Sequence, residues 1–284
     1  MKKTGKKINK LPFILIFALG FLIAIYPVIS NFYYRVNANN EIANFTKGKN
    51  ELDQKEIDRR IELARAYNES LDPSRLQDPF TQRQKEGIKE YARMLQIKEM
   101  IGHVQIDKIG VNLPIYAGTT EEVLQKGAGH LEGTSLPVGG ESTHTVITAH
   151  KGLPKALMFR HLDELKEGDV FYIHNIDTVL AYQVDNIVTV EPDNFEHVLV
   201  VEGKDYATLL TCTPYMINSH RLLVRGHRIP YTPPVEEDSL LSPGANMKYK
   251  LLLLLALLVI IILLIISYSY HKKIKGQEKN IKSK

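Results

Sequence analysis

Cysteine and tryptophan are scarce in this sequence of 284 residues, which contains one cysteine, Cys212, and no tryptophan. A single thiol cannot form an internal disulfide, and by itself it cannot supply a cysteine-based zinc site or hold an iron–sulfur cluster. We expect no metal and no cofactor. Cys212 is then a small buried residue, a free thiol or a nucleophile.

Positive charge is scarce between the two ends of the chain, although the formal net charge is +4. Residues 1–10 hold five lysines and no acid, and residues 271–284 hold six lysines and one glutamate. Positions 11–270 hold the remaining 25 basic and 31 acidic residues. This excess of acids over the body of the chain argues against a nucleic-acid partner.

Two long stretches have no charged residue at all. Residues 11–29 form the first, and residues 251–266 form the second, which Ser and Tyr extend to position 270. About 20 helical residues, at about 1.5 Å each, reach across a bilayer core of about 30 Å. We therefore predict transmembrane helices over 11–30 and 249–270. The alternatives are a signal peptide cleaved near Val36–Ala38 for the first stretch and a buried core helix for the second.

The lysine-rich tails, 1–10 and 271–284, lie beyond the outer ends of these stretches. The positive-inside rule then places both termini in the cytoplasm. Two spans with this orientation leave residues 31–248 outside the cell. The sequence thus predicts a multi-pass protein of the cell membrane, with the lipid bilayer as a partner and an extracellular domain.

The first part of the extracellular region, residues 31–99, has a helical pattern. Apolar residues recur every three or four positions over 51–71 and again over 81–95. Between them, two Asp-Pro pairs interrupt the helix, so we expect a loop at about 72–80. Residues 231–248, which contain several Pro, Glu and Ser residues, form a predicted linker to the second span.

Residues 100–230 change to the alternating pattern of strands. Short runs rich in β-branched and aromatic residues recur there, separated by Gly and Pro. Seven or eight short strands with brief helical inserts at 120–126 and 156–165 indicate a mainly β domain, either a closed barrel or a sandwich.

Cys212 is predicted to end one strand, because Pro214 follows it closely. Arg221 begins the next strand-like run, 221–225. If the two strands are antiparallel neighbours, the thiol and the guanidinium flank one end of the sheet, where a cation favours the reactive thiolate and can donate to an oxyanion. A core cysteine and a surface arginine are the plain alternatives.

A cysteine nucleophile also needs a proton carrier, which is usually histidine. The chain has ten histidines, so composition does not identify one. His150 closes the strand-like run 145–150, and His220 is nearer to Arg221 in the sequence, although strand alternation turns it away. We favour His150.

The run Thr208-Leu209-Leu210-Thr211-Cys212, followed by the segment from Asn218 to Gly226, resembles the signature of the sortases, transpeptidases of Gram-positive surfaces. The similarity extends over about residues 100–230. The resemblance implies an eight-stranded closed β-barrel. It also implies catalytic roles for Cys212 as nucleophile, His150 as proton carrier and Arg221 as the group that steadies the oxyanion.

Two features resemble the pilus-assembling class C sortases: the second apolar stretch, and Asp78-Pro79-Phe80, which is similar to the lid motif of that class. In such a lid, Asp78 pairs with Arg221 and Phe80 covers Cys212. A plain helix-linking turn is the alternative for these residues.

The resemblance implies a thioester mechanism in which the enzyme cleaves an LPxTG-like signal of one pilin and joins it to a lysine amine of the next. The implied partners are pilin subunits and, for wall anchoring, a housekeeping sortase. The alternatives are a housekeeping sortase acting on peptidoglycan, a non-catalytic adhesion or sensor ectodomain, and a cysteine protease.

Overall fold

The computed structural model describes residues 11–71 and 88–233, together with five single positions between 254 and 269. The chain divides into two compact units, one of residues 33–239 and the other of residues 1–32 and 240–284. The first of these units contains the strands named below.

The first helix, α1, spans Leu11–Asn50 and is longer than the predicted span of 11–30. Its polar second half continues the helix because it contains no proline. Among the described residues, one helix, covering Leu15–Asn50, is long and apolar enough to cross a membrane. The second predicted span, 249–270, lies almost entirely outside the described residues.

Helix α2, Gln54–Glu69, lies close to the amphipathic stretch expected at 51–71. Asp53 caps it, since the Asp53 carboxylate accepts a hydrogen bond from the Glu56 amide at 2.8 Å. One face of the helix is buried through Ile57, Ile61 and Ala64. Of the helix expected over 81–95, the described part, Ile88–Leu95, is a 3-10 helix.

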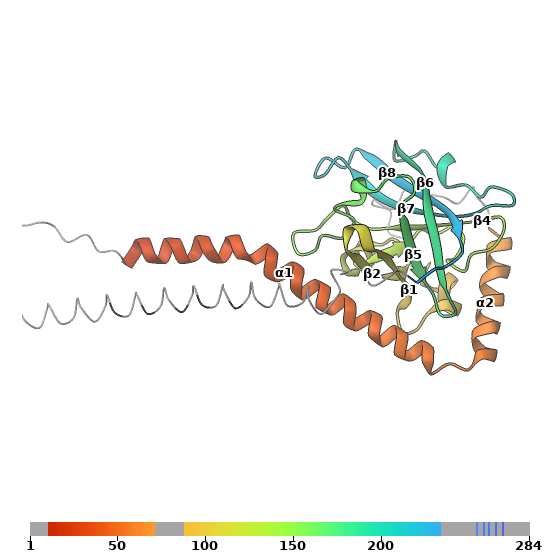
Figure 1. The fold of residues 1–284 in the computed structure, drawn as a ribbon, viewed down its shortest axis with the longest axis horizontal. Coiled ribbons are helices and arrows are strands. Elements are labelled where there is room, and N and C mark those ends of the chain that lie inside the picture. Colours follow the sequence, from red (N-terminus) through yellow and green to blue (C-terminus); the bar gives the residue numbers. More distant parts are fainter. Residues whose placement is uncertain are drawn as a thin grey trace, which may run out of the picture. The chain divides into compact units, whose positions relative to one another are not determined.

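Eight strands close into a barrel in the order β1-β2-β3-β4-β7-β8-β6-β5, which confirms the mainly β barrel prediction (Figure 1). The strands are β1 Met100–Ile106, β2 Val111–Ala117, β3 Ala128–His130, β4 Thr143–Thr148, β5 Val170–His174, β6 Val179–Val190, β7 Asp205–Thr213 and β8 His220–Ile229.

Two local expectations need correction. The sequence pattern marks seven strands and not β3, because a three-residue strand is too short to show an alternating pattern. The helical insert expected at 156–165 contains only a 3-10 turn, Leu162–Glu164. The other insert is helix α3, Glu121–Lys126, which Thr120 caps.

Alternate residues of the strands pack into two different apolar clusters. Leu209 and Val224 belong to the large cluster that fills the barrel. Leu210, Leu223 and Val146 point the other way, into a smaller cluster with Val198. This second cluster lies on the outer face of the barrel, under the β6–β7 loop of residues 191–204, and we call it the outer cluster. Since strand side chains alternate, Cys212 belongs to the same face as Leu210.

One glycine in β1 is required by close packing of two strands. A Cβ atom at Gly102 would overlap the carbonyl oxygen of His174 in β5. His103, the residue after Gly102, is paired with His174 where β1 lies against β5. A side chain at position 102 would therefore push apart the two strands that complete the barrel.

Candidate functional site

Cys212 and Arg221 are direct partners in the antiparallel pair of β7 and β8. Both side chains are largely buried, with relative exposures of 6% and 7%. The Arg221 guanidinium donates from Nη1 to the carbonyl oxygens of Asn218 and His220, each at 3.0 Å. The β7–β8 turn therefore fixes the guanidinium at the same barrel end as the thiol.

His150 follows β4, which runs parallel to β7 with Thr148 opposite Leu210. The Ala149 amide donates to the Leu210 carbonyl at 3.1 Å, so the two chains stay together beyond the end of β4. His150 and Cys212 each lie two residues past the Thr148–Leu210 pair. The register thus brings His150 to the same end of the barrel as Cys212.

The surroundings of His150 include one carboxylate that the sequence analysis missed. The His150 Nε2 atom lies 3.5 Å from Oε1 of Glu121, the first residue of α3. The Glu121 side chain is 68% exposed. The His150 carbonyl accepts from the Phe159 amide at 3.1 Å, which fixes the backbone there. No pattern in the sequence connects Glu121 to His150, because the helix and the strand meet only in the fold.

The two threonines of the motif 208–212 each hold a neighbouring segment. The Thr211 hydroxyl donates to the Ala149 carbonyl at 2.8 Å, next to His150. The Thr208 hydroxyl lies 2.7 Å from Nε2 of His144. Both threonines are fully buried. The residues of the motif therefore have structural roles. Leu209 packs inside the barrel, and the two threonines of the motif hold the strand that leads to His150.

His144 connects β4 with the β6–β7 loop. Its Nδ1 atom lies 2.9 Å from the carbonyl oxygen of Leu199. A carbonyl only accepts, so Nδ1 carries the proton and Nε2 accepts from the Thr208 hydroxyl. Burial lowers the pKa of His144 to about 4, so the ring is neutral at pH 7 and keeps this arrangement.

The β7–β8 loop, residues 214–219, closely follows Cys212 along the chain. The Arg160 guanidinium lies 3.4 Å from the centroid of the Tyr215 ring, a cation–π contact that fixes the start of this loop. Met216 and Ile217 are 80% and 71% exposed. Large exposed apolar side chains next to a nucleophile candidate are suited to contact a partner chain.

Asp78 and Phe80, the predicted lid residues, lie outside the described residues. Within the described ranges, no cluster of three or more His, Cys, Asp or Glu side chains is placed to hold a metal ion.

Comparison with known proteins identifies the family. The model of the sortase domain matches residues 104–229. Sortase A of Bacillus anthracis is 30% identical over 132 residues, which cover 46% of this chain and 61% of that protein. Sortase A of Streptococcus agalactiae is 30% identical over 117 residues, 40% of this chain and 47% of that protein. The chain thus matches less than two thirds of the length of these curated relatives.

Solved structures match more completely. A crystal structure of Streptococcus pneumoniae sortase C is 60% identical, with a TM-score of 0.66, and the match covers 69% of this chain and 100% of that one. A pilus-related sortase C of Group B Streptococcus is 61% identical, with a TM-score of 0.65 and coverage of 66% and 97%. The barrel, the motif ending at Cys212 and these matches agree, and the chain belongs to the sortase family of cysteine transpeptidases.

Proposed function

We propose that this sortase polymerises pilins, cleaving an LPxTG-like signal of one subunit and joining it to a lysine of the next. The observation that carries the proposal is the match of 60% identity over the full length of a sortase C structure. The pilus-related sortase C of Group B Streptococcus adds support at 61% identity. The sortase A relatives, at 30% identity, are more distant.

In the proposed first half-reaction, the Cys212 thiolate attacks the carbonyl carbon of the threonine in the signal. The bond between this carbon and the glycine nitrogen breaks, and His150 gives its proton to the departing amine. A thioester between the pilin and Cys212 remains. The pairing of Cys212 with Arg221 supports this assignment, because a guanidinium next to the nucleophile can donate to the oxyanion that forms.

In the second half-reaction, the lysine amine of another pilin attacks the thioester carbon. His150 takes the proton from this amine, and the Cys212 thiolate leaves as the isopeptide bond forms. A thioester splits one difficult exchange into two easier steps. The burial of Cys212 supports transfer to an amine rather than to water, because it limits the access of water to the thioester.

The proposal includes a membrane position for the enzyme. An apolar N-terminal helix of sufficient length supports an anchor there. With the predicted second span at 249–270, both basic tails would be cytoplasmic and the barrel would face the pilins outside the cell. A housekeeping sortase would then attach the finished polymer to the wall.

Replacement of Cys212 by alanine tests the proposed function. The full-length wild-type enzyme should join pilin subunits in membranes, and mass spectrometry should find the threonine carboxyl linked to a lysine amine. The Cys212→Ala enzyme should form no joined product, because no thioester can form. Joining by the alanine variant would contradict the role of Cys212. A cell-wall peptide as the acceptor would instead identify a housekeeping sortase.

The proposed lid leads to a separate prediction. If Asp78 engages Arg221 and Phe80 covers Cys212, then the double change Asp78→Ala and Phe80→Ala should increase the rate at which a thiol reagent labels Cys212, by about 10-fold or more. The matched control is the double change Asp72→Ala and Leu71→Ala in the same connection. Equal labelling rates in the wild-type and lid variants would show that no lid protects the thiol.

A further inference from the structure

The carboxylate of Glu121 lies beside the imidazole of His150, the proposed proton carrier. Its Oε1 atom is 3.5 Å from Nε2 of His150. The same oxygen accepts a hydrogen bond from the side-chain amide of Gln125, at 2.6 Å, one turn further along α3. A single carboxylate oxygen therefore contacts both groups, and Gln125 holds it in this place.

Helix α3, which carries Glu121, is fixed at both ends. At its start, the Thr120 hydroxyl accepts a hydrogen bond from the Val123 amide at 3.4 Å. At its end, the hydroxyl of Tyr34 in α1 donates to the carbonyl of Lys126 at 2.5 Å. The Glu121 side chain thus projects from a fixed backbone, and so its place beside the imidazole is a stable feature of the fold.

The lysines close to Glu121 and His150 are paired with other carboxylates. Lys151, the residue after His150, lies 2.9 Å from Asp163. Lys126, in the last turn of α3, lies 3.2 and 3.1 Å from two other glutamates. Among the described residues, the His150 imidazole is the ionisable partner that lies within 4 Å of the Glu121 carboxylate.

A positive charge on His150 needs an anion at this end of the barrel. The His150 side chain is 19% exposed, and its Nε2 atom is buried. The buried guanidinium of Arg221 at the same end has a like charge, which disfavours an imidazolium. The Cys212 thiolate offsets this only while it is free. Once the sulfur is bonded to the carbonyl carbon it has no negative charge, whereas Glu121 keeps its own.

We propose that Glu121 is a positioning residue for His150. Its carboxylate accepts the proton on Nε2, which orients the ring with Nδ1 toward the reacting groups, and its charge stabilises the imidazolium. The proton on Nδ1 passes to the departing glycine amine, and Nδ1 later takes the proton from the attacking lysine. The Nε2 proton stays on the ring throughout.

This inference rests on the proposed function, which gives His150 its role as proton carrier. The distance of 3.5 Å between the two side chains is that of the enzyme without substrate. Hydrogen bonds of catalytic groups are often long in that state and shorten when the substrate is bound.

The test compares Glu121→Gln with its parent enzyme in the rate of thioester formation. Both are full-length chains that also carry Asp78→Ala and Phe80→Ala, so that a lid cannot limit the rate. Mass spectrometry follows the acyl-enzyme after mixing with a peptide that contains the LPxTG-like signal. The rate constant at saturating peptide should fall about 5-fold, as expected for an ion pair open to solvent, while the peptide concentration at half-maximal rate changes little.

Ionic strength separates the charge of Glu121 from its shape. Glutamine has nearly the same size and can still accept a hydrogen bond from Nε2, so the two enzymes differ in charge. The ratio of the two rate constants should be about 5 at low salt and approach one at 1 M salt, where the Debye length is about 3 Å. A role of the side chain in packing alone would give the same ratio at both salt concentrations.

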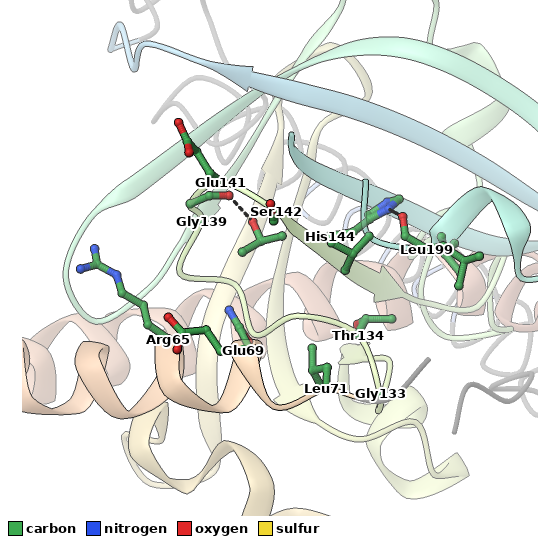
Figure 2. A pocket seen from close by; sticks show the side chains of 15 residues that line it. Arg65, Glu69, Leu71, Gly133, Thr134, Gly139, Glu141, Ser142, His144 and Leu199 are labelled. Carbon is green, nitrogen blue, oxygen red and sulfur yellow. Dashed lines mark hydrogen bonds between the residues drawn. The ribbon is translucent and has the colours of Figure 1, made fainter. Parts of the chain in front are cut away.

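Two other carboxylates serve as matched controls. Glu122→Gln removes the same charge from the next residue of α3. Glu69→Gln removes a charge at another place, because Glu69 lines a cavity of about 500 Å³ between α2 and the β6–β7 loop (Figure 2), which neither Glu121 nor His150 lines. Both variants should keep the rate constant of the parent enzyme at low and at high salt.

A Glu121→Gln enzyme with the rate constant of its parent would overturn the inference and leave the proposed function intact. A loss that does not change with salt would also overturn it, because the charge would then have no part in the effect. An equal loss in either control variant would do the same. A parent enzyme that forms no thioester with the peptide would instead contradict the proposed function.

Discussion

Thr211 shows how a single hydroxyl can determine the position of a catalytic candidate on another strand. It lies next to Cys212 in β7, and its hydroxyl donates to the carbonyl of Ala149, the residue before His150. Thr211 and Ala149 are both fully buried, so neither the hydroxyl nor the carbonyl can form a hydrogen bond with water instead. Thr211 is therefore a positioning residue for His150 relative to Cys212.

Replacement of Thr211 by valine should lower the free energy of unfolding by about 1 to 3 kcal/mol, because the buried Ala149 carbonyl loses its donor. It should also lower kcat more than it changes KM, since His150 is displaced rather than the substrate site. Denaturant unfolding and peptide-cleavage kinetics would measure both effects. Thr211→Ser, which keeps the hydroxyl, is the control and should restore most of kcat. A valine variant with the wild-type kcat would contradict this role.

At the scale of elements, the β6–β7 loop is held to the barrel by one buried ring and a few apolar side chains. His144 bridges the Leu199 carbonyl and the Thr208 hydroxyl, at 2.9 and 2.7 Å. Val198 packs into the outer cluster on the same face as Cys212. The loop consequently covers the outer cluster on the strands that lead to Cys212.

Replacement of His144 by phenylalanine should release this loop. The ring volume is retained, but the Leu199 carbonyl and the Thr208 hydroxyl both lose a partner, at a cost of about 1 to 3 kcal/mol for each group. Amide hydrogen exchange over 196–204 should become about 10-fold faster or more, while strands β1 and β5 exchange as before. His161→Phe, where the side chain is 45% exposed, serves as the control. An unchanged exchange rate in the loop would show that the apolar contacts alone hold it.

At the scale of the whole molecule, three buried histidines and the partly buried His174 make the stability of the barrel depend on pH. Burial lowers the pKa of His103 to about 3. Burial is also the main reason why the pKa values of three other histidines fall to about 4; these are His130, His144 and His174. The rings of His103 and His174 stack with centroids 4.1 Å apart. Such rings are neutral in the folded protein well below the ordinary histidine pKa of about 6.5.

The free energy of unfolding should therefore be highest above about pH 6.5 and fall as the pH decreases toward 4. In that window the unfolded chain binds protons that the folded chain does not, and each histidine contributes up to about 1.4 kcal/mol per pH unit. Urea unfolding measured at intervals from pH 7.5 to 4 would give this slope. A free energy of unfolding that stays constant over this range would contradict the prediction.

His103→Phe assigns part of that slope to one residue. The His103 Nδ1 atom is buried and has no hydrogen-bond partner among the described residues, so phenylalanine removes a polar atom and keeps the stacked ring. The slope of stability between pH 6.5 and 4 should decrease by about 1 kcal/mol per pH unit, with no loss of stability at pH 7.5. A slope equal to that of the wild type would show that His103 does not contribute.

The sequence by itself determined the class of fold, and it named Cys212, His150 and Arg221 as candidates for the chemistry. Apolar and polar residues alternate over 100–230, which indicates strands, because a half-buried strand has one apolar and one polar face. The motif ending at Cys212 indicates the family. The pairing of Cys212 with Arg221 also followed from the sequence, since two strands joined by a short turn are usually antiparallel neighbours.

Only the tertiary structure decided which distant segments meet. The parallel pairing of β4 with β7 brings His150 toward Cys212, and no local pattern encodes that pairing. The three-residue strand β3, the approach of Glu121 to His150 and the cavity between α2 and the β6–β7 loop depend in the same way on contacts between elements far apart in the chain. Local periodicity reports which face of an element is buried, whereas the closure of the barrel selects its neighbours.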